Sequence, residues 1–381
     1  MAEATPAIAP QRAGGREADA PVLIVGAGPA GLATGRELGE RRIRCRVLER
    51  GPTPAPVWHN LYDSLRLHTG RHLSTLPGLR YPRGTSLFPS RTEFIAYLER
   101  YRDMFEIDVA TGTDVARATP ANGRGWILET SRGEYETGTL VIATGIVSSP
   151  VIPRFEGQDA FQGTIRHSVK YRRPDPFRDR RVLVVGCGNS GAEIASELAG
   201  HARSVTVAIR TGANVVPLTI AGVPVQYIAY GLRRLPAPAR KAVVALIRTL
   251  VDARRGPPQI PRPPWGPLDR IPLIGFHLGD AIRDGRVRAA PGIACLTADG
   301  ARFVDGTADR FDDVILATGF RPALQPLEGV VRRDSAGFAL REGRVKSADR
   351  ADLFFVGHNY DSSGGIQNIA RDAVLAAGQI A

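Results

Sequence analysis

The sequence predicts an α/β protein with two Rossmann-like dinucleotide-binding domains, the second inserted into the first. A short apolar run, a glycine-rich turn and a helical pattern follow one another twice, starting at Val22 and again at Val182. Each repeat later closes with an apolar run that ends in Ala-Thr-Gly, at 143–145 and at 317–319. The chain of 381 residues, 43% of them hydrophobic, is long enough for two packed domains.

The expected elements follow from where the apolar patterns begin and end. Strands are expected where short apolar runs stop at glycine, and helices where apolar residues recur three or four positions apart. In chain order we expect strands over 22–25 and 43–48 around a helix that ends at Gly39, a strand over 140–143, strands over 182–185 and 204–209 around a helix that carries Ile194, a strand over 314–317, a strand over 353–357 and a helix over 366–377.

The composition excludes several classes of protein. The three cysteines, Cys45, Cys187 and Cys295, are far apart, which excludes a disulfide framework, a CxxC dithiol and a zinc cluster, so we expect no metal. The net charge is +12, but all except three of the 50 basic residues are arginines scattered along the chain, and we expect no nucleic-acid binding. No apolar run approaches the roughly 18 to 20 residues of a membrane span, and the start lacks a signal-peptide pattern. We therefore expect a cytoplasmic protein without a transmembrane segment.

The first glycine-rich turn has the spacing of a dinucleotide site. Gly26, Gly28 and Gly31 form GxGxxG between a strand and a helix. The first glycine permits a tight turn, the second lets a pyrophosphate approach the backbone, and the third lets helix and strand pack closely. Glu49, at the end of the next strand, is placed to accept ribose hydroxyls, with Arg50 beside it.

The second glycine-rich turn repeats this spacing without the acid. Its candidate cofactor residues are Gly186, Gly188, Asn189, Ser190 and Gly191. The position equivalent to Glu49 is Ile209, and Arg210 follows it. Because a guanidinium binds a ribose 2′-phosphate that a carboxylate would repel, this site predicts NADPH rather than NADH. Two dinucleotide sites in one chain predict hydride transfer from NADPH to a flavin, FAD, held by the first module.

The domain limits follow from this assignment. We expect a disordered lead over 1–20, an FAD-binding domain over 21–150 and 308–381, and an NADPH-binding domain over 151–307 with an irregular, proline-rich insertion over 213–275. Within the insertion, 241–251 has the pattern of a helix with a broad apolar face. Such a helix either packs over the active-site mouth, which we favour, or makes a loose contact with a membrane surface or a partner.

A family resemblance appears between the two modules. Residues 161–171, FQGTIRHSVKY, resemble FxGxxxHxxx(Y/F), the identifying motif of the class B flavin-containing monooxygenases. The motif ends in Tyr171 rather than in the Trp of the Baeyer–Villiger branch, so the resemblance disfavours lactone-forming chemistry. Within it, His167 is expected to hold the linker by hydrogen bonds. Lys170, a candidate catalytic residue, or Arg172 is expected to contact the NADP phosphates, or else both belong to a solvated basic stretch.

A finer resemblance concerns residues 58–69, WHNLYDSLRLHT, and 182–191, VLVVGCGNSG. Both are similar to the auxin-forming YUCCA group of flavin monooxygenases and their bacterial relatives. The resemblance implies that Trp58, His68 and Thr69 lie at the flavin. His68 stands where many family members have Asn, and it is either a catalytic residue or a core residue hydrogen-bonded to backbone. Further candidates at the cofactors are Thr144, Gly145, Thr318 and Gly319 of the Ala-Thr-Gly ends, and Gly357 and Gln367 near the last helix.

The resemblance implies an FAD- and NADPH-dependent monooxygenase that captures O2 as a C4a-(hydro)peroxyflavin and oxygenates a small organic substrate. Two reactions stay open: N- or S-oxygenation, and oxidative decarboxylation of a 2-oxo acid such as an arylpyruvate, which the YUCCA-like stretch favours. The alternative is an NADPH-oxidising flavoprotein reductase that passes electrons to a partner. The substrate wall is expected over 57–90 and 213–280, with contributions from Tyr227, Tyr230, Trp265 and His277. The oligomeric state is left open.

Overall fold

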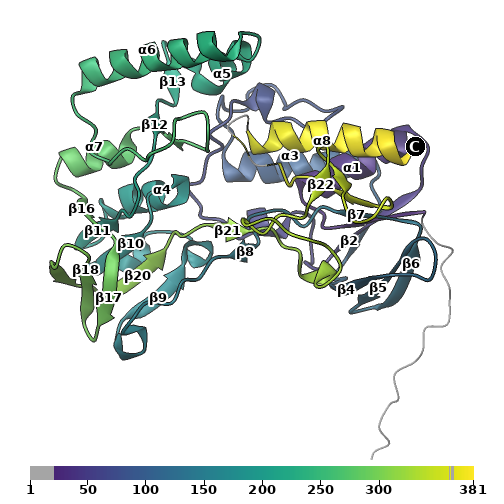
Figure 1. Cartoon of the computed structure of the whole chain (residues 1–381), viewed down its shortest axis with the longest axis horizontal. Coiled ribbons are helices and arrows are strands. Elements are labelled where there is room, and N and C mark those ends of the chain that lie inside the picture. The colour runs from purple at the N-terminus through teal and green to yellow at the C-terminus, as the bar shows by residue number, and fades with distance from the viewer. Residues whose placement is uncertain (1–20, 360, 362–363) are drawn as a thin grey trace, which may run out of the picture.

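The chain forms two α/β domains that lie side by side and are joined by two linkers (Figure 1). The computed structural model describes residues 21–359, 361 and 364–381. The expected disordered lead over 1–20 lies outside the described residues, as do Tyr360 and Ser362 of the last glycine-rich turn.

The first domain is built on a seven-stranded sheet in the order β22-β23-β24-β7-β1-β2-β3. Its central strand β1 pairs in parallel with β2 and β7, and helices α1, α3 and α8 cover one face while the three-stranded sheet β4-β5-β6 covers the other (Figure 1). The bounds are β1 Val22–Val25, α1 Pro29–Glu40, β2 Cys45–Glu49, α3 Arg91–Met104, β3 Val109–Thr111, β4 Val115–Pro120, β5 Trp126–Thr130, β6 Gly133–Thr137, β7 Thr139–Ile142, β22 Arg341–Glu342, β23 Lys346–Ser347, β24 Leu353–Phe355 and α8 Gly365–Ile380.

Strand β1 is apolar at every position because both of its faces are covered. Val22 and Ile24 pack in the core under the helices, and Leu23 and Val25 pack in the core with Trp126 of β5. Both sides of β1 are therefore buried, and the first glycine-rich turn follows directly at its carboxyl end.

The second domain repeats the design on a five-stranded parallel sheet in the order β16-β11-β10-β20-β9. Helices α4 and α7 cover one face and the sheet β17-β18-β19 covers the other. The bounds are β9 Thr164–His167, β10 Arg181–Val185, α4 Asn189–Leu198, β11 Ser204–Ala208, α7 His277–Arg283, β16 Arg288–Ala290, β17 Ile293–Thr297, β18 Gly300–Phe303, β19 Ala308–Arg310 and β20 Asp313–Leu316.

The expected two-domain α/β architecture, with the second domain inserted, is therefore confirmed, but one expected limit is wrong. Strand β19 pairs with β18, and β20 lies between β10 and β9, so the second domain continues to Leu316 instead of ending at residue 307. Strand β20 pairs in parallel with β10 as β7 pairs in parallel with β1, and both strands lie inside their sheets.

Two linkers cross between the domains. Strand β8, Ser149–Pro150, pairs antiparallel with β21, Phe320–Arg321. The Thr144 hydroxyl donates to the Ala323 carbonyl at 2.6 Å, and the Thr318 hydroxyl donates to the Val151 carbonyl at 2.6 Å. The threonine of each Ala-Thr-Gly end thus forms a hydrogen bond with the linker that follows the other Ala-Thr-Gly end.

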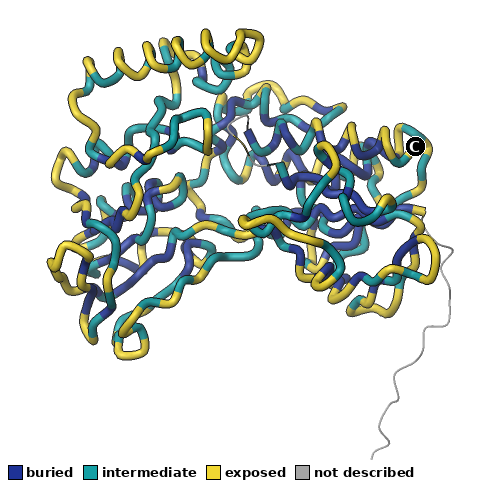
Figure 2. The backbone as a smooth tube through the Cα atoms, in the orientation of Figure 1, coloured by how far each residue is buried: buried dark blue, intermediate teal, exposed yellow. Residues whose placement is uncertain are grey.

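The insertion forms an outlying arm of the second domain, at the top left of Figure 1. No residue of its two helices, α5 and α6, is buried, as Figure 2 shows for α6. Across the described ranges, no helix combines the length and the apolar content that a membrane crossing requires. The bounds are β12 Val215–Val216, β13 Thr219–Ile220, β14 Val223–Pro224, α5 Val225–Leu232, α6 Ala237–Arg255 and β15 Leu273–Ile274, and the short helices elsewhere are α2 Pro56–His59, η1 Arg71–Leu73, η2 Gln158–Ala160, η3 Ser168–Lys170, η4 Asp175–Phe177 and η5 Gln325–Leu327.

Candidate active site

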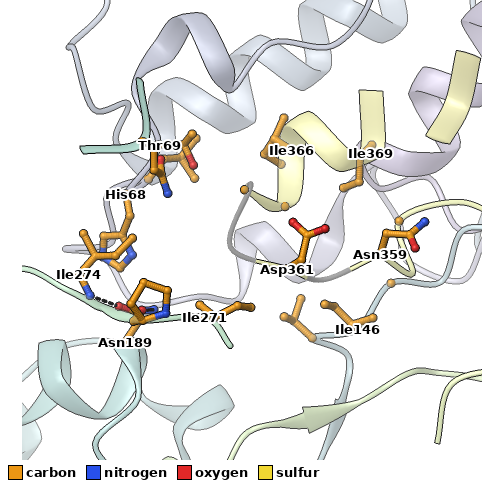
Figure 3. A pocket seen from close by; sticks show the side chains of 18 of the residues that line it. His68, Thr69, Ile146, Asn189, Ile271, Ile274, Asn359, Asp361, Ile366 and Ile369 are labelled. Atoms are coloured by element: carbon orange, nitrogen blue, oxygen red, sulfur yellow. Dashed lines mark hydrogen bonds between the residues drawn. The ribbon is translucent and has the colours of Figure 1, made fainter. Parts of the chain in front are cut away.

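A cavity of about 860 Å³ lies where the two domains and the insertion meet. Figure 3 shows side chains from all three parts around it, with His68 and Thr69 on one side and Asn359, Ile366 and Ile369 on another. The residues expected at the cofactors that line this cavity are Gly26, Gly28, Glu49, Arg50, Trp58, His68, Thr69, Thr144, Gly145, Asn189 and Gly357. Residues far apart in the sequence thus line the same cavity.

The first glycine-rich turn fits a dinucleotide phosphate. A Cβ on Gly31 would lie 1.8 Å from the Gly26 carbonyl oxygen, so this glycine is needed for packing between helix and strand. A Cβ on Gly28 would meet no atom within 4 Å and would project into free space at the start of α1. The first turn of α1 has neither a side-chain cap nor an acidic residue, and its backbone N–H groups and dipole favour an anion there.

Glu49 is buried at the end of β2, with 5% of its surface exposed. One carboxylate oxygen accepts from the Ala27 backbone N–H at 2.8 Å, and the other accepts from the Gly51 backbone N–H at 2.8 Å. Each oxygen keeps lone pairs for further donors, such as ribose hydroxyls. The carboxylate is therefore fixed next to the glycine-rich turn, and this geometry fits the adenosine half of FAD.

The second glycine-rich turn has the same geometry at the start of α4. A Cβ on Gly191 would lie 2.1 Å from the Gly186 carbonyl oxygen, whereas a Cβ on Gly188 would meet nothing within 4 Å. The first turn of α4 again lacks a side-chain cap and an acidic residue. These features fit a second dinucleotide phosphate.

Asn189 holds the insertion in place. Its side-chain oxygen accepts from the Ile274 backbone N–H at 2.9 Å, as drawn in Figure 3, and its side-chain nitrogen donates to the Pro272 carbonyl at 3.2 Å. The amide therefore links the start of α4 to the returning strand of the insertion. This connection was not foreseen from the sequence, where Asn189 was expected to contact the cofactor.

Arg210 is exposed and follows the buried Ile209 at the carboxyl end of β11. Strands β10 and β11 pair in the same register as β1 and β2, since Val185 lies opposite Ala208 and Val25 lies opposite Leu48. Ile209 is thus the structural equivalent of Glu49. Arg210 lies outside the cavity, on the second domain.

A hydrogen-bonded cluster joins the two domains beside the cavity. Glu193 of α4 bonds to the imidazole Nε2 of His68 with one oxygen, and it accepts from the Tyr62 hydroxyl with the other. Because an ionised carboxylate only accepts, Nε2 carries the proton in this pair, and Nδ1 of a neutral His68 keeps its lone pair. Burial and the neighbouring Glu193 raise the pKa of the Tyr62 phenol, so it stays protonated. Sequence reasoning missed both Glu193 and Tyr62.

Two further residues adjoin this cluster. The Ser190 side chain is hydrogen-bonded to Tyr62, so this expected cofactor residue also contacts the first domain. His277 at the start of α7 has a lowered pKa, chiefly because it is buried, while Glu193 acts in the opposite direction. Its Nε2 atom is buried without a hydrogen-bond partner among the described residues. His277 is therefore neutral at pH 7.

His167 holds a linker, as expected. Its Nδ1 atom accepts from the Val169 backbone N–H at 3.2 Å, and its Nε2 atom bonds to the Gly319 carbonyl at 3.1 Å. Burial lowers the pKa of His167. The ring thus connects β9 to the second Ala-Thr-Gly end as a neutral group.

Several expected site residues lie away from the cavity. Lys170 is exposed at the end of η3, outside the cavity. Gln367 lines a separate hollow of about 360 Å³ together with His72 and Arg371. Gln367 lies on another face of α8 than Ile366 and Ile369, which line the main cavity.

The part of the substrate wall that the insertion contributes is aliphatic rather than aromatic. The expected segments do line the cavity, but the expected side chains Tyr227, Tyr230, Trp265 and His277 do not. On α5 the lining face follows helical spacing, and Tyr227 points elsewhere, with its hydroxyl 2.9 Å from Nδ1 of His72. The insertion's aliphatic lining residues are Ala213, Val215, Val216, Val225, Ile228, Ala229, Leu232, Val244, Ile247, Val251, Ile260, Leu268, Ile271 and Ile274.

Two glycine-rich phosphate sites, one per domain, beside a shared cavity define a flavoprotein oxidoreductase that binds two dinucleotides. Comparisons with known proteins agree. The Pyridine nucleotide-disulphide oxidoreductase family model matches residues 23–216, and the Flavin-binding monooxygenase-like model matches residues 126–337. The chain therefore belongs to the flavin-binding monooxygenase-like family. It is a flavin-dependent monooxygenase with FAD and NADPH as cofactors, and it acts on O2 and a small-molecule substrate.

The curated relatives with similar sequences include indole-3-pyruvate monooxygenases. The chain is 32% identical over 388 residues to "Indole-3-pyruvate monooxygenase YUCCA8" of Oryza sativa subsp. indica, covering 94% of this chain and 90% of the relative. It is 33% identical over 309 residues to "Indole-3-pyruvate monooxygenase YUCCA1" of Oryza sativa subsp. japonica, covering 78% and 76%. These matches confirm the expected YUCCA similarity, and they give no support to the alternative of an electron-transferring reductase.

Solved structures confirm the fold. The flavin-containing monooxygenase from Stenotrophomonas maltophilia matches with a TM-score of 0.74 at 24% identity, covering 94% of this chain and 97% of that one. Cyclohexanone monooxygenase from Rhodococcus sp. Phi1, bound to NADP+, matches with a TM-score of 0.72 at 19% identity, covering 94% and 83%.

Proposed function

We propose that this monooxygenase carries out the oxidative decarboxylation of a 2-oxo acid with an aromatic side chain, an arylpyruvate. The single observation that carries the proposal is the similarity, at 32% identity over 94% of this chain, to proteins named indole-3-pyruvate monooxygenases. The balanced reaction converts the 2-oxo acid, O2, NADPH and H+ into the carboxylic acid one carbon shorter, CO2, NADP+ and H2O. When bound, FAD supplies the redox chemistry that passes electrons from NADPH to O2.

The cofactor contacts belong to the same proposal. FAD is held by the phosphate site at Gly28 and by Glu49, and NADPH is held by the phosphate site at Gly188 and by Arg210, whose charge pairs with the 2′-phosphate. His68 lies at the edge of the cavity, and its Nδ1 lone pair is available to take up a proton. Lys170 is exposed outside the cavity, so we assign it no catalytic role.

The cavity chemistry supports an amphipathic anion as substrate. The aliphatic wall of the insertion fits an aromatic side chain. Four arginines from 248 to 283 line the cavity, and three of them are in ion pairs: Arg255 and Arg283 with Asp280, and Arg262 with Asp252. Arg248 has no acidic partner within the described part of the chain. We propose that Arg248 binds the substrate carboxylate.

A turnover experiment tests the proposed reaction. The FAD-loaded protein is incubated with NADPH, ¹⁸O2 and phenylpyruvate or indole-3-pyruvate, and the products are measured by mass spectrometry. We expect the arylacetate with one ¹⁸O atom and one CO2 for each NADPH. Oxidation of a tertiary amine or thioether instead, with the 2-oxo acids unchanged, would identify an N- or S-oxygenase.

A cytoplasmic location remains a prediction that cell fractionation tests.

A further inference from the structure

Helix α6 exposes a second apolar stripe that faces away from the cavity. Its inner residues Val244, Ile247 and Val251 line the cavity. On another side of the helix, at spacings of three and four residues, lie the exposed residues Ala239, Ala242, Leu246, Leu250 and Ala253. Leu246 is 59% exposed and Leu250 is 61% exposed. A helix with apolar residues on two sides and no buried residue has one of these sides without a partner.

Exposed apolar side chains concentrate on this arm. Large hydrophobic residues that are exposed elsewhere are scattered, whereas the segment 223–250 contributes Val223, Tyr230, Leu235, Leu246 and Leu250. Figure 2 shows α6 as an exposed helix at the outer edge of the molecule. Such a concentration on one outlying element is typical of a docking surface.

The charge of the arm indicates what it docks on. Residues 225–255 contain seven basic side chains and one acidic side chain, so 31 residues carry half of the chain's net charge of +12. The single acid, Asp252, is paired with Arg262. Arg233, Arg234 and Arg254 are exposed, and the Arg233 guanidinium lies 5.8 Å from the Tyr230 ring centroid.

We propose that α6 docks on an anionic lipid surface, with Leu246 and Leu250 entering the acyl boundary and the basic residues contacting the headgroups. Helices that lie in a membrane interface combine these two features. A second copy of this chain would bring two arms of the same high positive charge together, which disfavours self-association through this stripe. The helix would then face lipid with one side and the cavity with another. This inference does not depend on which substrate the enzyme oxidises.

Vesicle binding of the FAD-loaded full chain tests the proposal. Vesicles of phosphatidylcholine with and without phosphatidylglycerol are sedimented with the protein at low and high salt. We expect binding only with phosphatidylglycerol, and weaker binding at high salt. The double variant L246S/L250S should bind roughly tenfold or more weakly, and R233Q/R234Q should lose about fivefold for each charge removed.

A matched control separates the stripe from exposed apolar surface in general. The variant I152S/V304S changes two residues that are 63% and 67% exposed in other parts of the molecule, and it should bind vesicles like the parent protein. All three variants should keep the parent's FAD content and its NADPH oxidation without vesicles, because none of the changed residues lines the cavity. Absence of binding to phosphatidylglycerol vesicles, or equal binding by L246S/L250S, would overturn the proposal. A dimer in solution that L246S/L250S converts to a monomer would assign the stripe to a second copy and overturn it as well.

Discussion

The imidazole of His68 and the carboxylate of Glu193 are hydrogen-bonded across the boundary between the two domains. His68 belongs to the loop that lines the cavity from the first domain, and Glu193 lies one turn into α4, which begins at the second glycine-rich turn. The same carboxylate accepts from the Tyr62 hydroxyl. A single acidic side chain therefore couples the position of α4 to the orientation of a cavity histidine.

Glu193→Gln should lower kcat about tenfold and increase the H2O2 released per NADPH, because the amide no longer accepts both hydrogen bonds and His68 loses its orientation. Product formation, NADPH consumption and peroxide are measured together, with kcat followed across pH. Glu197→Gln is the control, since Glu197 lies one turn further along α4 and bonds to Tyr171 instead. An unchanged pH profile and unchanged coupling in Glu193→Gln would show that the contact only holds the domains together.

Gly28→Ala should give a folded protein without FAD. The new methyl group would meet no protein atom within 4 Å, so it does not disturb the apoprotein, but it would occupy the space where the pyrophosphate approaches the backbone. Absorbance of the purified protein gives the FAD content, and circular dichroism gives the fold. Gly39→Ala, in the same helix and equally free of neighbours, should keep its FAD. A yellow Gly28→Ala protein at full stoichiometry would refute the phosphate site.

Arg210→Ala should raise the Michaelis constant for NADPH roughly 10- to 100-fold and leave that for NADH nearly unchanged. The expected loss is one charge-assisted contact to the 2′-phosphate, about 1.5 to 3 kcal/mol. Initial rates with both nucleotides give the ratio. Arg203→Ala, another exposed arginine near the start of β11, serves as the control. An equal effect of Arg210→Ala on both nucleotides would mean that another group binds the phosphate.

Arg248→Ala should raise KM for a 2-oxo acid about tenfold, since a charged partner of the substrate carboxylate is removed. It should leave kcat and the KM for NADPH close to the parent values. Arg254→Ala, on the same helix but outside the cavity lining, is the matched control. Equal KM values in the two variants would remove Arg248 from the substrate site.

His358 should make the protein less stable in acid. Burial, with Arg341 nearby, lowers the pKa of His358 to about 3, whereas an unfolded chain takes up this proton near pH 6.5. Between these values the unfolded state binds more protons, so the free energy of unfolding falls as pH falls, by up to about 1.4 kcal/mol per pH unit. His358→Leu should flatten this dependence in urea titrations from pH 7 to pH 4. Neither ring nitrogen has a hydrogen-bond partner among the described residues, so the change removes no hydrogen bond to any of them. The exposed His201, changed to Gln, should leave the slope as it is.

Local patterns predicted the two dinucleotide modules well. Strand β1 spans the expected residues and α1 ends one residue beyond Gly39, because strand, glycine turn and helix are all encoded within about twenty neighbouring positions. The position of Glu49 at the end of β2 was predicted for the same reason. The partners of the cavity residues were not found, since His68 and Glu193 are 125 positions apart and nothing in either local pattern marks the other.

The sequence also did not predict which side chains of the insertion line the cavity. Its helix over 241–251 was expected, and α6 does span Ala237–Arg255. Which face of α5 lines the cavity depends on how the arm docks onto the first domain, where Tyr227 packs against Gly70 and bonds to His72. Helical periodicity gives the spacing of a face but not its direction relative to a distant loop.

The pairing of β8 with β21 has a consequence for how such a chain can be rearranged. Pro150 and Phe320 are neighbours across the two strands, so the polypeptide leaves and re-enters the first domain at nearly the same point. Paired residues on adjacent antiparallel strands are only about 5 Å apart. Residues 151–319 therefore form a cassette with adjoining ends. Another nucleotide-binding unit with the same end separation could be grafted in its place while the first domain keeps its own sheet intact.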